Sequence, residues 1–243
     1  MDYSTFVDLV RTCKTCPLGV KGVGVPGAWF KDGSRSSERV SGGVMVIAEA
    51  PGAIEQDQGW PVVGSSGDLL HAMLNEVGVS FYYVTNVAKH RPWVVKGKQQ
   101  PPDAVAIKAC SPYLDLEFSM VQPTRLILLG KTAAKLALPG NISIGEEVGT
   151  TVEYNRCDHP HNCSVHDGRP CLGPVIPALI LYHPAYFLHN RTSRWVNKGM
   201  KDWKKAVRVF MGGRPAEYKV EKVGCPTHDA ESTVLPIVGE DGC

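Results

Sequence analysis

The stretch Val44–Leu70, which reads VMVIAEAPGAIEQDQGWPVVGSSGDLL, sets the expected fold. Its first five residues are apolar, which predicts a buried strand of a parallel sheet. Glu49 follows that strand directly, a Pro-Gly turn comes next, and a polar loop is expected across residues 55–57. Ser65 and Ser66 then predict the start of an amphipathic helix. Ligands of α/β sheets bind at the carboxyl ends of strands, so this loop is a candidate functional site.

Outward from this stretch, strands and helices alternate along the chain. Further strands are expected at 81–87, 125–130 and 175–182, and helices at 2–12, 103–120, 131–138 and 193–210. The alternation predicts an α/β fold, a three-layer αβα sandwich with a mostly parallel four-stranded central sheet. Residues 20–43 are rich in Gly and Ser and are expected to form an irregular surface segment.

One domain is expected over residues 1–211, with a Cys- and His-rich insertion at 155–173 and a loosely held tail over 212–243. The chain has 243 residues, of which 43% are hydrophobic, so it can bury a core. Its formal net charge of +2 gives no overall attraction to nucleic acid, and any DNA binding would depend on local patches. The chain carries no signal-peptide pattern and no apolar run of membrane-spanning length. We expect a cytoplasmic protein with no membrane partner, whose eight cysteines are metal ligands or free thiols.

Polar side chains stand at the ends of three expected strands: Glu49, Asn86 and His183. Because the carboxyl ends of parallel strands meet at one rim of a sheet, we expect these side chains to lie close together. Each of them alone has an ordinary explanation as a cap or a solvated surface group. Together, on converging strand ends, they favour a functional site.

With these residues the chain resembles the uracil-DNA glycosylase superfamily, most closely its family 4, the iron–sulfur branch with relatives beside phage DNA polymerases. The matching motifs, in family order, are Cys13-x-x-Cys16, Glu49-Ala50-Pro51-Gly52, Gly59-x-Pro-x-Val-Gly64, Asn86-Val-x-Lys89-x-Arg91-Pro92, Cys110-x-Pro-Tyr-Leu114 and His183-Pro-Ala-Tyr186. The resemblance implies a monofunctional hydrolase of base-excision repair. Such an enzyme cleaves the N-glycosidic bond of uracil flipped out of DNA and leaves an abasic site.

The resemblance also implies a role for each matching residue. Asn86 would read the flipped base, because its amide matches the N3–H and O4 groups of uracil. His183 would donate toward O2, and Glu49 would stabilise the sugar cation or orient water. Residues expected around the base are Ala50, Pro51, Gly52, Glu55 and Val62, with Glu55 beside the 5-position. Residues expected to contact DNA are Ser65, Ser66, Gly67, Lys89, Arg91, Leu188 and His189.

A [4Fe–4S] cluster is implied on Cys13, Cys16, His90 and Cys110. The family has Cys where His90 stands, but imidazole replaces thiolate in some iron–sulfur centres. The alternative is a cluster that is lost or labile. A bound cluster would be structural and would pin the Lys96–Lys98 loop beside DNA. A zinc site on Cys157, Cys163 and Cys171 is a second hypothesis, and a thiol-bearing insertion without metal is its alternative.

The chain departs from the family at Val62, where a Phe stacks on uracil. Loss of that ring removes stacking of about 1–3 kcal/mol. This leaves a weakened uracil enzyme, or a glycosylase for a 5-substituted pyrimidine, as alternatives. A third alternative is a phage-encoded, replication-associated DNA-binding protein with little activity. The loop after His90 lacks the His of the covalently trapping branch, so no covalent trapping is expected. We expect a monomer that acts on single- or double-stranded DNA.

Overall fold

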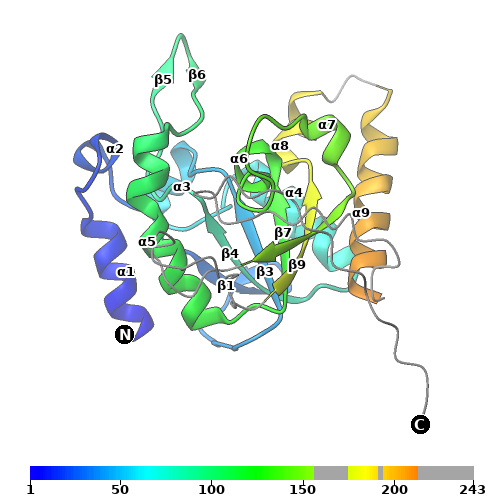
Figure 1. Ribbon diagram of the computed structural model, residues 1–243, viewed down its shortest axis with the longest axis horizontal. Helices are drawn as coiled ribbons and strands as arrows, with labels where there is room; N and C mark the ends of the chain where they lie inside the picture. Colours follow the sequence, from blue (N-terminus) through cyan, green and yellow to red (C-terminus); the bar gives the residue numbers. More distant parts are fainter. Residues whose placement is uncertain (156–174, 191–193, 213–243) are drawn as a thin grey trace, which may run out of the picture.

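The computed structural model describes residues 1–155, 175–190 and 194–212 (Figure 1). The cysteines of the hypothetical zinc site, Cys157, Cys163 and Cys171, lie outside the described residues. The same holds for the tail beyond residue 212. Across the described part of the chain, no helix is both long enough and apolar enough to span a membrane.

The core of the fold is a seven-stranded sheet with the order β2-β1-β4-β3-β7-β9-β8. Its four central strands are parallel and are the four that the sequence predicts: β4 (Phe81–Asn86), β3 (Val44–Ala48), β7 (Arg125–Leu129) and β9 (Val175–Leu181). The mostly parallel α/β prediction is therefore confirmed. The predicted number of four strands was wrong, because antiparallel strands extend both edges: β1 (Ala28–Lys31), β2 (Ser34–Arg35) and β8 (Thr151–Asn155).

Strand β1 lies inside the segment that was predicted to be irregular. Its residues Trp29 and Phe30 are buried on opposite faces of the sheet, and the strand pairs antiparallel with β4. The ring of Trp29 packs edge-on against Tyr83 at 4.7 Å between ring centroids. The prediction failed because a four-residue strand within a Gly- and Ser-rich segment gives almost no periodic signal.

Two layers of helices cover the sheet (Figure 1). The helices are α1 (Tyr3–Thr12), α2 (Pro17–Lys21), α3 (Ala53–Gln58), α4 (Ser65–Glu76), α5 (Ala104–Val121), α6 (Gly130–Ala134), α7 (Ile144–Glu147), α8 (Pro184–His189) and α9 (Val196–Gly212). One hydrophobic cluster joins α4, α8 and α9 to one face, and a second joins α5 and α6 to the other. This arrangement confirms the three-layer αβα prediction.

Local signals account for most of the helix boundaries. The Asp103 side chain accepts a hydrogen bond from the Ala106 N–H at 2.7 Å and caps α5, as predicted. Helix α4 begins at Ser65 as predicted, but its N-cap residue is Gly64, so no serine side chain caps it. Helix α3 replaces the polar loop expected at residues 55–57, because Glu55 closes a capping interaction with the Gly52 N–H.

Candidate functional site

The structure places Glu49, Asn86 and His183 on one rim of the sheet. Asn86 ends β4 opposite Ala48 of β3, and Glu49 is the next residue after β3. The Glu49 carboxylate accepts a hydrogen bond from the Thr132 hydroxyl, which stands in α6 beyond the end of β7. His183 follows β9, and its Cβ would lie 3.7 Å from a Cβ added at Gly130. Four neighbouring strands therefore deliver polar groups to one place.

Thr132 was missed in the sequence because a hydroxyl on a short helix has no distinctive pattern. Its only signal is that it follows a buried strand by a few residues, as Glu49, Asn86 and His183 do. Its hydrogen bond leaves Glu49 half-buried and fixed in orientation. A fixed carboxylate at a strand end is suited to stabilise positive charge or to orient a water molecule.

His183 is a neutral imidazole at the start of α8. Its Nδ1 accepts a hydrogen bond from the Ala185 N–H at 3.2 Å, which assigns the ring proton to Nε2. Burial lowers the pKa of His183 to about 4, although the nearby Glu55 carboxylate acts in the opposite direction. The ring is therefore uncharged at neutral pH and offers one N–H donor, Nε2.

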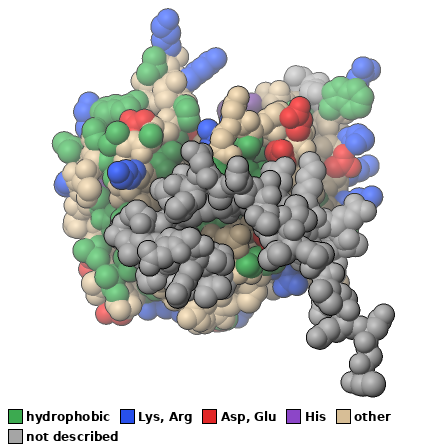
Figure 2. Space-filling model, in the orientation of Figure 1, with side chains coloured by type: hydrophobic (Ala, Val, Ile, Leu, Met, Phe, Trp, Pro, Cys, Tyr) green, Lys and Arg blue, Asp and Glu red, His purple; other side chains and the backbone are tan. Residues whose placement is uncertain are grey.

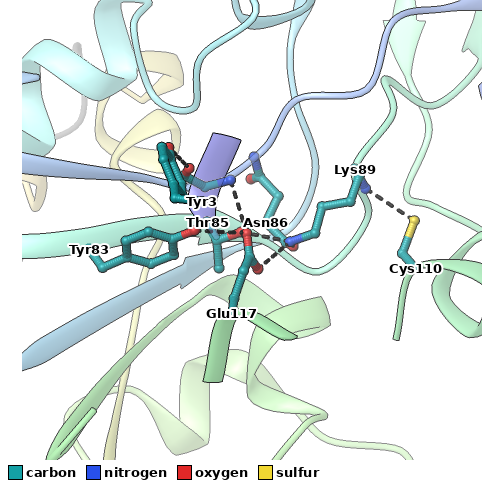
Figure 3. A network of polar contacts seen from close by, with 8 residues as sticks. Tyr3, Tyr83, Thr85, Asn86, Lys89, Cys110 and Glu117 are labelled. Atoms are coloured by element: carbon teal, nitrogen blue, oxygen red, sulfur yellow. Dashed lines mark hydrogen bonds and ion pairs between the residues drawn. The ribbon is translucent and has the colours of Figure 1, made fainter. Parts of the chain in front are cut away.

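Asn86 is buried, with 2% of its surface exposed. Its backbone carbonyl accepts a hydrogen bond from Lys89 Nζ at 2.8 Å, which fixes the turn at the end of β4. In Figure 3 the Asn86 amide points away from the Lys89–Glu117 network. An amide held in this way can present a fixed donor and acceptor pair to a planar ligand.

Lys89 was predicted to contact DNA, and that prediction was wrong (Figure 3). Its side chain is fully buried, and Nζ lies 2.6 Å from Glu117 Oε2. The Glu117 carboxylate also accepts hydrogen bonds from Thr85, Tyr83 and the Gly27 N–H. The motif that contains Lys89 gives no sign of Glu117, which lies 28 residues further along. The only signal for Glu117 was a charged residue on the apolar face of the predicted helix 103–120.

Glu55 acts on the backbone of the site. Its Oε2 accepts from the Gly52 N–H at 3.0 Å, and its Oε1 accepts from the Gly64 N–H at 3.0 Å. One carboxylate therefore joins the turn after β3 to the start of α4. Ala50, Pro51 and Gly52 lie in that turn, directly beyond β3. The position of Glu55 beside the 5-position of a bound base stays a prediction.

Val62 has a left-handed backbone, with φ of +47°, which is rare for a β-branched residue. Its side chain is only 5% exposed and belongs to the core cluster of α4, α8 and α9. The Val62 carbonyl accepts from His71 Nε2 at 3.1 Å, and His71 Nδ1 accepts from the Tyr82 hydroxyl at 2.7 Å. Any Cβ at residue 67 would lie 1.8 Å from the Val62 oxygen, which explains Gly67. His71 was missed in the sequence analysis.

The other expected DNA contacts lie near the same rim. Ser65 is exposed and Ser66 half-buried at the start of α4, while Leu188 and His189 lie at the end of α8. The Arg91 Nε donates to Gln99 Oε1 at 3.3 Å. The Gln99 amide in turn donates to the Pro51 carbonyl at 3.1 Å.

Gln99 belongs to a two-stranded hairpin, β5 (Val94–Val95) and β6 (Lys98–Gln99), that projects from the body (Figure 1). Figure 2 shows a notch between this hairpin, which carries cationic side chains at its tip, and the end of the molecule with α6, α7 and α8. The hydrogen bond from Gln99 to Pro51 ties the base of the hairpin to the turn after β3. The hairpin is thus one wall of an opening above the rim.

Cys13, Cys16 and Cys110 are buried free thiols. Burial raises the pKa of the Cys110 thiol, and Cys16 packs beside Ala106 and Ala109 of α5, the helix that carries Cys110. The Lys89 N–H donates to Cys110 Sγ at 3.2 Å. In the described residues no group of three or more His, Cys, Asp or Glu side chains is arranged to hold a single metal ion. Ligands of a four-iron cluster stand farther apart, because each binds a different iron.

His90 is 1% exposed, and neither ring nitrogen has a hydrogen-bond partner within the described part of the chain. The Cys13 carbonyl is nearby but outside hydrogen-bond geometry. Cβ atoms added at Gly19 and Gly24 would lie 3.2 Å from Cε1 and 3.1 Å from Nε2, so these glycines make room for the ring. Buried nitrogen atoms are almost always paired, so an unpaired imidazole beside three thiols fits a metal cluster.

The fold and the rim are those of an α/β protein whose binding site lies at the carboxyl ends of its parallel strands. Residues 38–210 match the family model of the uracil DNA glycosylase superfamily, and the chain belongs to that superfamily.

Curated relatives support the assignment. A type-4 uracil-DNA glycosylase of Pyrobaculum aerophilum is 31% identical, over 88% of this chain and 95% of the length of that relative. A protein of the same name from Sulfurisphaera tokodaii is 35% identical over 84% of this chain and 88% of its own. Another, from Saccharolobus solfataricus, is 31% identical over 86% of both chains.

Proposed function

We propose that the protein is a monofunctional uracil-DNA glycosylase that hydrolyses the N-glycosidic bond of a uracil flipped out of DNA. The observation that carries the proposal is the neutral His183, whose Nε2–H donor shares one rim with Asn86 and Glu49. Curated relatives of the protein are named type-4 uracil-DNA glycosylases, which supports uracil as the base. We further propose that the protein acts as a monomer, inside the cell where its DNA substrate lies.

The positions of the three side chains support the following mechanism. The Asn86 amide binds the N3–H and O4 of uracil, a pattern that cytosine lacks. The bond between C1′ and N1 breaks, and its electron pair leaves with the base. His183 Nε2–H donates to O2 and stabilises the charge that develops there. Glu49, held by Thr132, stabilises the sugar cation and orients the water whose oxygen bonds to C1′. The Glu49 carboxylate takes the proton that this water loses, and the released uracil anion takes up a proton from solvent.

Cys13, Cys16, His90 and Cys110 would hold a [4Fe–4S] cluster. The unpaired nitrogens of His90 support this ligand set. When bound, the cluster supplies rigidity, since base hydrolysis needs no electron transfer. It would fix the segment from Lys89 to Arg91, because the Lys89 N–H already donates to Cys110. That segment leads from Asn86 into the hairpin β5–β6.

DNA would enter the notch between the hairpin and α8 (Figure 2). Lys96 and Lys98 of the hairpin would bind phosphates from one side. Leu188 and His189 would enter the duplex from the other side, where the base has left. The start of α4 would bind a phosphate through the N–H groups of Ser65 and Ser66. The Gly67 N–H already donates to the Gly64 carbonyl at 2.7 Å, so Gly67 would contribute only the close approach that a residue without a side chain allows.

A second candidate function is excision of a 5-substituted pyrimidine. It is favoured by Val62, whose side chain packs into the core and offers no aromatic surface to the base. A pocket without that ring has room for a larger base. In this reading the Asn86 and His183 roles are unchanged, and only the shape of the pocket differs.

The test is a glycosylase assay on single- and double-stranded oligonucleotides that contain uracil, with protein purified without oxygen. Alkali-labile product that disappears in Asn86→Ala and His183→Ala establishes uracil excision. If wild-type protein binds DNA but releases no uracil, the proposal fails. The same assay with 5-substituted pyrimidines then separates the second candidate from a DNA-binding protein without glycosylase activity.

A further inference from the structure

Three arginines stack on aromatic rings at the β1–β2 edge of the sheet. The guanidinium carbon of Arg35 lies 4.0 Å from the ring centre of Trp60, and that of Arg11 lies 4.8 Å from the same ring. The guanidinium carbon of Arg39 lies 4.6 Å from the ring centre of Tyr3. These distances are those of cation–π contacts.

The three arginines form one patch. Burial and the Glu117 charge raise the pKa of the Tyr3 phenol, and the charges of Arg39, Arg35 and Arg11 all act against that rise. All three guanidinium groups therefore lie within electrostatic reach of one hydroxyl. They come from α1, from β2 and from the segment after β2, and they meet only in the folded chain.

No carboxylate in the part of the chain that the structure describes forms an ion pair with Arg11, Arg35 or Arg39. Over residues 1–155, 175–190 and 194–212, the ion pairs join Lys31 to Glu38, Lys89 to Glu117, Lys198 to Asp202 and Lys204 to Glu76. Glu38, the acidic residue between Arg35 and Arg39 in sequence, is thus held by Lys31 at 2.8 Å. Two guanidinium groups against one indole repel each other, and a bound anion would relieve that repulsion. The planar guanidinium group matches phosphate in particular.

The patch adjoins the proposed base pocket. Trp60 lies in the loop from Gly59 to Gly64, which contains Val62. A Cβ added at Gly59 would lie 3.5 Å from Arg11 Nη2, so Arg11 also contacts the start of that loop. The Arg11 carbonyl accepts from the Gly24 N–H, and the next residue, Val25, donates to the carbonyl of Lys89 at 2.7 Å. Arg11 therefore lies one short segment away from the end of β4, where Asn86 stands, and Arg35 joins it on the ring of Trp60.

We propose that Arg11 and Arg35, stacked on Trp60, bind a backbone phosphate of the DNA strand where it leaves the base pocket, and that Arg39 extends this path along the sheet edge. The inference rests on the proposed function, because it takes DNA as the substrate. Stacking on Trp60 holds both guanidinium groups in place before DNA arrives, so less side-chain freedom is lost on binding. The site is separate from the start of α4 and from the hairpin.

The experiment compares Arg11→Gln/Arg35→Gln with a matched control, Lys201→Gln/Lys205→Gln. Both variants remove two positive charges. The control residues are exposed on α9, on the opposite side of the molecule from α1 (Figure 1). The ligand is a fluorescent single-stranded oligonucleotide with a central tetrahydrofuran abasic analogue, which the enzyme cannot hydrolyse. Dissociation constants are measured from low to high salt, for a long oligonucleotide and for a trinucleotide.

Each phosphate contact that is lost on a single strand lowers the slope of log K against log salt by about 0.7. The double variant removes two guanidinium groups, which contact one phosphate or that phosphate and its neighbour, so its slope should fall by about 0.7–1.4. At about 0.1 M salt its affinity for the long oligonucleotide should fall roughly 5- to 25-fold. The control should match wild type, and the trinucleotide, too short to reach the patch, should bind all proteins alike. Arg35→Gln alone, at an exposed position, should show about half of the change in slope.

An unchanged slope in both arginine variants overturns the inference. An equal loss in the α9 control also overturns it, because the effect would then reflect net charge and not a site. Melting temperature and iron content, measured on every variant, identify any misfolded protein, and Arg35→Gln then decides the question alone. Uracil release by wild type is scored separately, so a failure of the proposed function is distinguished from a failure of the arginine site.

Discussion

Lys89 Nζ lies 2.6 Å from Glu117 Oε2, and both side chains are completely buried. The same lysine donates to the Asn86 carbonyl, and its own N–H donates to Cys110 Sγ. Lys89 therefore connects the end of β4 to Cys110 of the thiol group (Figure 3). Because a buried charge is costly when it stands alone, this pair is expected to be a point of high sensitivity in the fold.

Replacing either partner alone should destabilise the protein strongly. Lys89→Met leaves the Glu117 carboxylate buried without a cation, at a cost of about 3–5 kcal/mol. The double variant Lys89→Met/Glu117→Gln removes both charges and keeps an acceptor for the Gly27 N–H. The free energy of unfolding of this double variant, measured in urea, should return most of the way to the wild-type value. Destabilisation of the double variant equal to the sum of the two single changes would contradict a coupled pair.

The pH dependence of stability should contain a contribution from His183. Its pKa is about 4 in the folded protein and 6.5 in the unfolded reference, so the unfolded chain takes up the proton first as pH falls. The associated stability is complete above pH 6.5 and is lost progressively from pH 6.5 to about 4. His183→Gln keeps a donor but does not titrate, so its unfolding free energy should depend less on pH in this window. If the unfolding free energies of wild type and His183→Gln depend on pH identically, His183 does not make this contribution.

Restoring an aromatic ring at position 62 should separate the two candidate substrates. If the natural substrate is uracil, Val62→Phe adds base stacking of about 1–3 kcal/mol and raises kcat/KM for uracil by about 5- to 150-fold. Val62→Leu, which enlarges the side chain without a ring, is the control and should not raise it. Loss of excision of a 5-substituted pyrimidine, with no gain on uracil, would favour the second candidate.

His90 should determine how firmly the cluster is held. His90→Cys supplies a fourth thiolate and should retain both iron and the absorbance near 400 nm, with slower loss in air than wild type. His90→Ala removes the ligand and should lower the iron content. Iron analysis and spectra of protein purified without oxygen measure both effects, independently of activity. Wild-type iron content and spectra in His90→Ala would show that the imidazole is not a ligand.

Several features of this protein follow from the sequence by itself. Apolar runs of five to seven residues predict the central parallel strands, and the polar residues at the ends of three of these strands predict the rim. The placement of Glu49, Asn86 and His183 on that rim is confirmed, and their chemical roles stay predictions. The family assignment is also confirmed, because its motifs are local and occur in order along the chain.

Other features are decided only by the tertiary structure, because they depend on residues far apart in sequence. From the sequence, Lys89 is expected to be an exposed lysine of a motif. In the fold, α5 places Glu117 against it and both side chains are buried. Val62 is a motif residue in the sequence, and only the fold shows that its backbone is left-handed and that His71 binds its carbonyl. Arg11, Arg35 and Trp60 come from three separate segments and form a patch only at the sheet edge. Local patterns determine which elements form, whereas burial and charge pairing depend on which elements pack together.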